Sequence, residues 1–317
     1  AEDYFVVSKI LAYNLKPLII VVNNYFLNNI GWYNIHNLIT HFDVDSIIYN
    51  PDIDIYKEMV RTTLRKYENL YVPSHFLYTS FPVHVAINKK IPLIIWGQLQ
   101  SIEQTGKFSH YDKVEMSKWN RKEHDLIGLE LDDILGTGAQ ISPLKVDFYN
   151  YPQLTLLNNV LGIYLSNYFC WDPLKQNNST LKYGFKPQFN SKSFDVYERS
   201  GCSVYYELHD LLKFKKYKFK KVTDQLVREI RHKRLDLKEA IKINESYLKE
   251  KVYIDKFFEW LGVTKSGMDW FIKHKLTNYS HLIGKDNYKN KNVINIGNYL
   301  KKGEISKHSF LKYYKGI

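Results

Sequence analysis

Ile91-Pro92-Leu93-Ile94-Ile95-Trp96-Gly97 is the stretch of sequence that decides the fold. It is apolar on both faces and ends on a glycine, and two similar runs, Pro17–Val22 (PLIIVV) and Ser46–Tyr49 (SIIY), lie nearer the amino terminus. A strand that is apolar throughout is typical of a parallel sheet covered by helices. The three runs therefore predict an α/β fold with a parallel sheet.

Helical patterns separate these apolar runs. Apolar side chains recur at helical spacing in residues 4–14, 34–42, 54–67 and 81–89. Strand and helix therefore alternate over the first 135 residues, as they do in βαβ units. A doubly wound domain ordinarily begins with a strand, which a phosphate-binding loop follows. Because residues 4–14 predict a helix, the first strand and its loop are expected to be missing.

Polar side chains follow the predicted strands. Ligands of open α/β sheets bind outside the carboxyl ends of the strands, so the residues at these ends are candidate nucleotide contacts. They are Asn23, Asn50, Trp96, Gly97 and Gln98. The alternative is that the amides cap strands or turn the chain, and that the Trp96 ring belongs to the core or to a pocket wall.

The character of the sequence changes after Gly136. Residues 136–139 and Ser142-Pro143 predict a hinge, and the chain beyond them is mostly helical, with helices expected at 236–249 and 253–276 and an exposed loop at 285–292. We therefore predict a nucleotide-binding α/β domain over residues 1–135 and a mainly helical domain over residues 136–317.

Composition limits the class of protein. The formal net charge of +12 and isoelectric point near 9.3 favour anionic partners, although biased codon usage explains a lysine-rich chain equally well. Cys170 and Cys202 are too few for a disulfide framework or a four-cysteine metal site, and a reducing cytoplasm fits them best. The chain has no apolar run of about 20 residues, which a membrane span would need, and its start does not have the basic character of a signal peptide.

The segment Tyr205–Ala240 carries the densest positive charge. Ten Lys and Arg residues lie between Lys213 and Arg234, against only Asp224 and Glu229. Charge alone indicates a phosphate-binding surface. In its first half, aromatic residues alternate with lysines, while in its second half apolar residues recur at helical spacing. We therefore expect a loop or short extended piece that leads into an amphipathic helix with a face to bury.

Several blocks of the sequence resemble one known family. WDPLKQ (171–176), LKFKKY (212–217), VTDQ (222–225) and EIRHKR (229–234) are similar to the C-terminal blocks of the N-acetyl sugar amidotransferases of lipopolysaccharide and pseudaminic or legionaminic acid biosynthesis. IGWYNI (30–35), Val44-Asp45, Ser74-His75 and the 91–97 run follow the same family's order in the first half. The resemblance thus extends over nearly the whole chain.

The resemblance implies a fold and a reaction. The fold would be a PP-loop (adenine nucleotide alpha-hydrolase-like) domain that binds ATP with Mg²⁺. ATP would activate the acyl oxygen of a sugar acetamido group, and ammonia would displace it to give an acetamidino group. The ammonia would come from a separate glutaminase subunit, because this chain has no convincing nucleophile and base of its own. Cys170 lies in an aromatic-rich run, which favours a buried structural thiol.

The sequence also departs from the family's pattern. Family members carry a Ser-Gly-Gly-Lys-Asp-Ser loop at the start of the first helix, where this chain has Ala1-Glu2-Asp3-Tyr4. Asp3 is retained, but Glu2 stands in place of the lysine and would repel phosphate. The family's zinc-type cysteine pairs are absent, Gln98 replaces an acidic residue, and Gln104-Thr105-Gly106 replaces Tyr-Gly-Gly. The chain is either a fragment or a member that has lost ATP cleavage, and the apolar surface that a missing central strand would expose favours the fragment.

The candidate site residues follow from the sequence and the resemblance together. His75, Asp224 and Arg231 are the candidate catalytic residues, and Asp3 joins the strand-end residues as a candidate nucleotide contact. Five residues are candidate contacts to a sugar or sugar nucleotide, namely Asp172, Lys175, Lys213, Arg228 and Arg234. The structural alternatives are a packing or capping role for His75, an ion pair of His209 or Asp210 with Arg231, and a solvated face for the lysines.

Two other classes of function remain open. The basic run with its interleaved Phe214, Tyr217 and Phe219 would suit RNA, which other PP-loop enzymes modify. The apolar helical face and the acidic residues within the run disfavour this reading, so a nucleic-acid partner is not expected. The chain could also be a subunit that binds the glutaminase or the sugar without catalysing a reaction.

Overall fold

The computed structural model describes residues 1–99, 103, 113, 115–136, 141–153, 159–189, 192–198, 200–201, 205–284 and 296–301. Packing divides the chain into two compact units. The sheet unit comprises residues 2–24, 38–183 and 306–317, and the helical unit comprises residue 1 with residues 25–37 and 184–305. The units are interleaved along the chain, and helix α2 (Asn29–Phe42) contributes residues to both. The predicted functional boundary between residues 135 and 136 stays a prediction.

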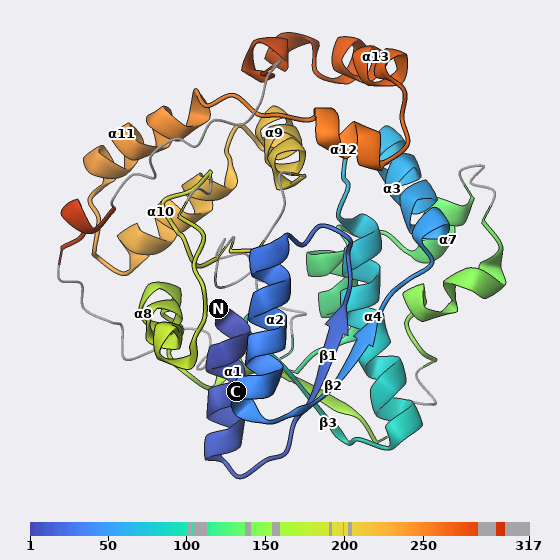
Figure 1. Cartoon of the computed structure of the whole chain (residues 1–317), viewed down its shortest axis with the longest axis vertical. Coiled ribbons are helices and arrows are strands. Elements are labelled where there is room, and N and C mark those ends of the chain that lie inside the picture. Colours follow the sequence, from blue (N-terminus) through green and yellow to red (C-terminus); the bar gives the residue numbers. More distant parts are fainter. Residues whose placement is uncertain are drawn as a thin grey trace. The chain divides into compact units, whose positions relative to one another are not determined.

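Four strands form the sheet unit's β-structure (Figure 1). β1 (Leu18–Val22) pairs in parallel with β2 (Asp45–Tyr49), in a register that places Leu18 opposite Asp45. β3 (Leu93–Trp96) pairs in parallel with β4 (Leu161–Tyr164), and Leu93 lies opposite Leu161. The predicted α/β class and the predicted parallel pairing are therefore confirmed.

The strands make two sheets, where the sequence predicted one. Within the described residues each sheet has two strands, β1-β2 and β3-β4, and helix α4 (Val72–Lys89) contacts both β1 and β3. The outer edge of β4 is covered, because Met116 N donates to Gly162 O at 2.8 Å beside an antiparallel bridge between Glu115 and Ile163. The apolar runs thus specified strands correctly without specifying how many pair together.

β4 lies in the half of the chain where patterns typical of strands become sparse. Its four residues, LGIY, include a glycine, which weakens a strand pattern. The glycine is needed for packing, since a Cβ at Gly162 would lie 2.9 Å from the Cβ of Met116. Close approach of a neighbouring segment therefore explains a residue that local propensity disfavours.

Helices of the sheet unit agree with the sequence pattern. α1 (Glu2–Ala12), α2 and α3 (Ile53–Tyr67) confirm three predicted helices, and Asp52 caps α3 by accepting from the backbone N–H of Asp54 and Ile55. α4 begins nine residues before the predicted segment 81–89 and contains Pro82. α1 packs against α8 (Pro173–Ser179), and its Val6 and Ile10 form a buried cluster with Leu165 and Trp171.

Five helices make up most of the helical unit. They are α9 (Tyr206–Tyr217), α10 (Lys221–Arg231), α11 (Leu237–Leu248), α12 (Asp255–Trp260) and α13 (Lys265–Lys275). α10 and α11 confirm the predicted amphipathic helix and the helix at 236–249. They pack against each other around Val222, Leu226, Ala240, Ile243 and Tyr247.

Two local predictions in this unit were wrong. The segment before the amphipathic helix is not extended: α9 continues to Tyr217 and buries Leu208, Leu211 and Leu212, whose spacing is helical. The single helix predicted at 253–276 is interrupted between α12 and α13, where Gly262 has a φ of +75°. Such a φ ends a helix readily only at glycine.

Shorter elements connect the main ones. They are α6 (Lys118–Asn120), the π-helix η1 (Arg121–Asp125), α7 (Leu131–Leu135), and the 3-10 segments η2 (Pro143–Tyr149), η4 (Leu165–Asn167), η5 (Thr180–Tyr183), η6 (Thr277–Leu282) and η7 (Ile296–Asn298). The predicted hinge residues 137–139, the loop at 285–292 and the sequence Gln104-Thr105-Gly106 lie outside the described residues. No helix in the described part of the chain is long and apolar enough to cross a membrane.

Candidate functional site

Two predicted nucleotide contacts meet at the carboxyl ends of β1 and β2. Asn23 Nδ2 donates to Asn50 Oδ1 at 2.9 Å, and Asn23 N donates to Tyr49 O at 2.9 Å. Asn23 is buried, whereas Asn50 is exposed. The polar residues at the strand ends are therefore in contact although they lie 27 positions apart, as the pattern predicted. The amide of Asn50 is exposed and so accessible to a ligand.

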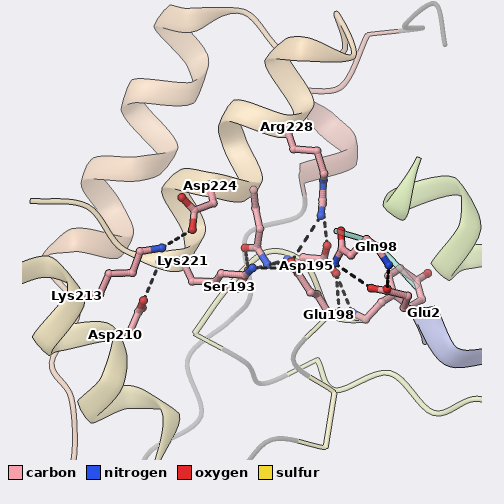
Figure 2. Close-up of polar contacts among 12 residues, drawn as sticks. Glu2, Gln98, Ser193, Asp195, Glu198, Asp210, Lys213, Lys221, Asp224 and Arg228 are labelled. Carbon is pink, nitrogen blue, oxygen red and sulfur yellow. Dashed lines mark hydrogen bonds and ion pairs between the residues drawn. The ribbon is translucent and has the colours of Figure 1, made fainter. Parts of the chain in front are cut away.

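Glu2 and Gln98 meet at the carboxyl end of β3. The backbone N–H of Gln98 donates to Glu2 Oε1 at 2.8 Å, and Gln98 Nε2 donates to Glu2 Oε2 at 2.9 Å (Figure 2). Gly97 allows this approach, because a Cβ there would lie 2.0 Å from Glu2 Oε1. The carboxylate at the start of α1 therefore occupies two donors at the predicted nucleotide edge.

The same edge contains buried polar atoms without partners. Trp96 Nε1 and Gln98 Oε1 have no hydrogen-bond partner in the described structure. Leu99 N donates to Ser166 Oγ at 3.1 Å, which fixes the chain just beyond Gln98. Asp3, the other carboxylate in the first turn of α1, is exposed. The end of β3 thus carries two donors that the Glu2 carboxylate occupies and a buried acceptor, Gln98 Oε1, without a partner.

Arg228, a predicted substrate contact, lies in a buried ion network of the helical unit. Its Nη2 is 2.8 Å from Asp195 Oδ2, its Nε is 2.9 Å from Glu229 Oε1, and its Nη1 is 3.5 Å from Glu198 Oε2. Burial lowers the pKa of Arg228, but the three carboxylates raise it more, so the net shift is upward. The guanidinium is held charged by carboxylates that it shields from water.

The network extends along α10 (Figure 2). Arg234 Nε is 2.6 Å from Glu229 Oε2, Lys221 Nζ is 2.9 Å from Glu198 Oε1, and Lys213 pairs with Asp224. Burial raises the pKa of Glu198, but Lys221 and Arg228 lower it further, to about 2.

The network balances its own charge. Lys213, Lys221, Arg228 and Arg234 face Asp195, Glu198, Asp224 and Glu229, four cations against four carboxylates. Four of the ten basic residues of the run are therefore paired with carboxylates within the fold, so the net field of the run is weaker than a count of its Lys and Arg residues suggests. In the structure these residues form ion pairs within the helical unit. Their functional roles stay predictions: substrate binding for Lys213, Arg228 and Arg234, and catalysis for Asp224.

Two further residues that the sequence analysis considered, Asp210 and Arg231, are not among these eight charged residues. Asp210 accepts from the backbone N–H of Lys221 at 2.7 Å, which ties α9 to the start of α10. Arg231 lies exposed in the last turn of α10. Its catalytic role stays a prediction.

Asp172 and Lys175 lie at the start of α8. Asp172 is buried and caps the helix, accepting from the backbone N–H of Lys175 at 3.4 Å. This contact explains the Asp-Pro-Leu-Lys spacing in local terms, since the cap must accept three residues ahead. Sugar binding by either side chain stays a prediction.

His75, a predicted catalytic residue, lies in the first turns of α4 beside η1. Burial lowers the pKa of His75, and a hydrogen bond to the backbone carbonyl of Asp125 opposes that shift. Burial also raises the pKa of the Asp125 carboxyl to about 7, against the effect of Arg121. His75 therefore contacts the backbone of a residue whose carboxyl has a strongly raised pKa, and perturbed pKa values of this kind are common at functional sites.

Arg121 completes this cluster, and no pattern in the sequence predicted its buried position. Its exposed fraction is 1%, its Nε donates to Thr79 Oγ1 at 2.8 Å, and its Nη2 donates to Tyr149 O at 3.4 Å. Thr79 is four residues after His75, so α4 places both side chains on one face. Nothing in the local sequence RKEHD (121–125), which has the charge pattern of a solvated segment, distinguishes a buried arginine. Within the described residues, no group of three or more His, Cys, Asp or Glu is placed to hold a metal ion.

Comparison with known families gives one match. Residues 191–315 match the family described as LPS biosynthesis protein WbpG-like, C-terminal domain. The match covers α9, α10 and the Arg228 network, but less than half of the chain. No significant match is found among curated proteins. The carboxyl-terminal region is therefore similar to a domain of lipopolysaccharide-biosynthesis proteins.

Proposed function

We propose that the chain acts in lipopolysaccharide or related surface-sugar biosynthesis as an ATP-dependent amidotransferase on an N-acetyl sugar. The observation that carries the proposal is the match of residues 191–315, since it encloses the LKFKKY, VTDQ and EIRHKR blocks that resemble the amidotransferases. Those blocks form parts of α9 and α10 and supply four members of the ion network, namely Lys213, Asp224, Glu229 and Arg234.

The proposed chemistry replaces one oxygen by nitrogen. The acetamido oxygen attacks the α-phosphorus of ATP and pyrophosphate leaves, which makes the oxygen part of a good leaving group. Ammonia then adds to the acyl carbon, AMP departs with the oxygen, and an acetamidino group remains after loss of a proton. Sugar amide, ATP and ammonia thus give sugar amidine, AMP and pyrophosphate. A partner glutaminase would supply the ammonia.

In this proposal the nucleotide binds at the carboxyl ends of the strands. Asn23, Asn50 and Gln98 offer the amides that would bind ATP, with Trp96 and Gly97 beside them. Mg²⁺ bound to ATP needs only one or two protein carboxylates, and Asp3 at the start of α1 can provide one. The Glu2 carboxylate must leave the Gln98 donors before a phosphate oxygen can use them.

The sugar is proposed to bind through the remaining predicted residues. In the helical unit, Arg231 and Lys213 are proposed as cations for a phosphate of a sugar nucleotide. Arg228 and Arg234 would need to exchange a carboxylate partner for a substrate anion. In the sheet unit, Lys175 is proposed as a further cation. His75 of the sheet unit and Asp224 of the helical unit are each proposed as a group that transfers a proton.

Reconstitution tests the proposal directly. The natural protein is mixed with a glutaminase of the histidine-biosynthesis type, glutamine, Mg-ATP and a panel of nucleotide-linked N-acetyl sugars, and products are followed by mass spectrometry. We expect an amidine product together with AMP and pyrophosphate, and ammonium salt in place of glutamine should bypass the glutaminase. Formation of ADP and phosphate, or no ATP turnover with any sugar, would contradict the proposed activity.

One observation favours a second candidate, a subunit that binds without catalysis. Glu2 occupies the Gln98 donors with a negative charge where ATP phosphates would lie. Isothermal titration with Mg-ATP separates the two candidates, since a binding subunit gives no heat of ATP binding but still binds the sugar nucleotide or the glutaminase. Titration with RNA at two salt concentrations tests nucleic-acid binding, which should weaken steeply with salt if it occurs. The coding sequence upstream of Ala1 distinguishes a fragment from a degenerate member.

A further inference from the structure

Arg121 has unused hydrogen-bonding capacity in the interior of the sheet unit. Its Nη1 is buried and has no hydrogen-bond partner in the described structure, whereas Nε and Nη2 donate to Thr79 Oγ1 and Tyr149 O. Both of those acceptors are neutral. An arginine that is 1% exposed ordinarily pairs with an anion, because a buried cation without one is costly.

Nearby acidic groups do not supply that anion. Glu130 and Asp125 act on Arg121 through space, as does the Tyr151 hydroxyl, but none of the three forms an ion pair or hydrogen bond with it among the described contacts. Glu130 instead lies 3.6 Å from Lys122 Nζ. The carboxyl of Asp125 titrates near neutrality, so it is largely uncharged in mildly acidic solution.

Two aromatic rings flank the guanidinium. Its central carbon is 5.5 Å from the Phe76 ring centroid and 5.0 Å from the Tyr151 centroid. Rings on a guanidinium stabilise the cation and hold its plane, and so they fix the direction of its free N–H groups. Tyr151 is only partly buried, so one of the two flanking rings lies partly at the surface.

The backbone around Arg121 is also unusual. Arg121 begins the π-helical turn η1, and Ile127, two residues after its end, has a φ of +53°. π-Turns occur frequently at functional sites, and a β-branched residue at positive φ is strained. The surrounding packing thus holds Arg121 in the interior at a cost in backbone strain. An exposed arginine would not require an unusual backbone conformation.

We propose that Arg121 is the anchor of a binding site for a small monocarboxylate, with Thr79 orienting the guanidinium and Phe76 and Tyr151 enclosing the ligand. A single negative charge matches the single uncompensated cation, whereas a phosphate dianion would leave excess negative charge beside Glu130 and Asp125. The site is independent of the proposed amidotransferase reaction, and failure of either proposal leaves the other standing.

Acetate is the probe for this site. Acetate, formate and sulfate, which is a dianion at this pH, are titrated into the natural protein at constant ionic strength and at about pH 6, below the pKa of Asp125. Binding is followed by calorimetry and by the ¹⁵N signals of arginine side chains. We expect saturable binding of acetate and formate, a shift of one buried arginine signal, and sulfate affinity at least about tenfold lower.

Three variants test the assignment. Arg121→Lys keeps the charge but loses the fork, and we expect acetate affinity to fall about tenfold or more. Thr79→Val keeps Arg121 and removes the Nε acceptor, so affinity should fall by a smaller factor. Arg61→Lys is the matched control, because Arg61 is exposed and pairs with Glu58. Its acetate affinity should be unchanged.

Several results would overturn the proposal. Absence of saturable acetate binding to the natural protein would remove the site, and so would equal acetate affinity of folded Arg121→Lys. Sulfate binding as tight as acetate through the same arginine would overturn the assignment to a monocarboxylate. If Arg121→Lys does not fold, Thr79→Val and the arginine NMR signal decide the question without it.

Discussion

Arg228 Nη2 lies 2.8 Å from Asp195 Oδ2, and the two residues are 33 positions apart in the sequence. Both side chains are almost completely buried. The contact joins α10 to the segment that precedes α9, and Glu198 and Glu229 complete the carboxylate shell. A segment that looks like a basic surface in the sequence is therefore held inward by acids drawn mainly from outside it.

Removing the Arg228 charge should destabilise the protein strongly. Arg228→Met leaves buried Asp195 and Glu229 without their cation, and breaking a buried pair from one side costs about 3–5 kcal/mol. Urea denaturation measures the loss. Arg61→Met, which breaks an exposed pair, should cost no more than about 1 kcal/mol. A loss at Arg228 as small as at Arg61 would show that the network does not stabilise the fold.

Stability should depend on the ionisation of Asp125. Burial raises its pKa from 3.8 to about 7, so the folded state binds the proton more tightly than the unfolded state does. A raised carboxyl pKa makes this contribution to stability fall as pH rises from about 4 to 7, by at most about 4 kcal/mol. Asp125→Asn should be more stable than the natural protein at pH above about 7, and its own stability should decline less across that range. An identical pH dependence for the two proteins in chemical denaturation would contradict the assignment.

Neutralising Glu2 should open the carboxyl edge of β3. Glu2→Gln keeps the shape of the side chain but weakens its bonds to Gln98, at a cost of about 1 kcal/mol in stability. If ATP binds at this edge, its affinity should rise about tenfold, because a repulsive charge is gone. Calorimetric titration with Mg-ATP measures the change. Asp54→Asn removes an exposed carboxylate at another helix start and should change neither quantity. Unchanged ATP affinity in Glu2→Gln would place the nucleotide elsewhere.

Gly201 should resist substitution for reasons of space. Its φ is +92°, and a Cβ there would lie 2.4 Å from Gly31 Cα. Gly201→Ala therefore adds a backbone clash to conformational strain and should cost about 3 kcal/mol or more. Gly128 has a similar φ of +83° with nothing within 4 Å of a built Cβ, so Gly128→Ala isolates the strain, about 1–2 kcal/mol. Equal losses in thermal unfolding would show that the close approach has no energetic weight.

Local pattern predicted much of the sheet unit, for a clear physical reason. Val21 and Ile94 lie in runs that are apolar throughout and too short for a helix, so the pattern indicates strands, although in the structure these strands are only half-buried. The same argument located Asn23 next to Asn50, because parallel strands end at one edge. It failed for β4, where Gly162 weakens the pattern and the pairing partner is far away in sequence.

Some roles of candidate-site residues could not be predicted from the sequence, because their partners are distant in the chain. The role of Arg228 depends on Asp195 and Glu198, which lie outside the basic run, so charge counting over that run could not pair them. Arg121 depends on a π-turn and on Thr79 from another helix. Neither feature produces a periodic pattern of residue types in the sequence, so only the folded structure distinguishes this arginine from a solvated one.

The two separate sheets have a consequence for how the chain behaves at high concentration. Within the described strands, β1 pairs only with β2 and β3 only with β4, so neither β1 nor β3 has a second strand partner there. Neither LIIVV nor LIIW contains a charged residue or a proline, which commonly prevent edge-to-edge pairing of strands. Self-association at high concentration is therefore expected to occur by addition of a β-strand from another copy to one of these edges.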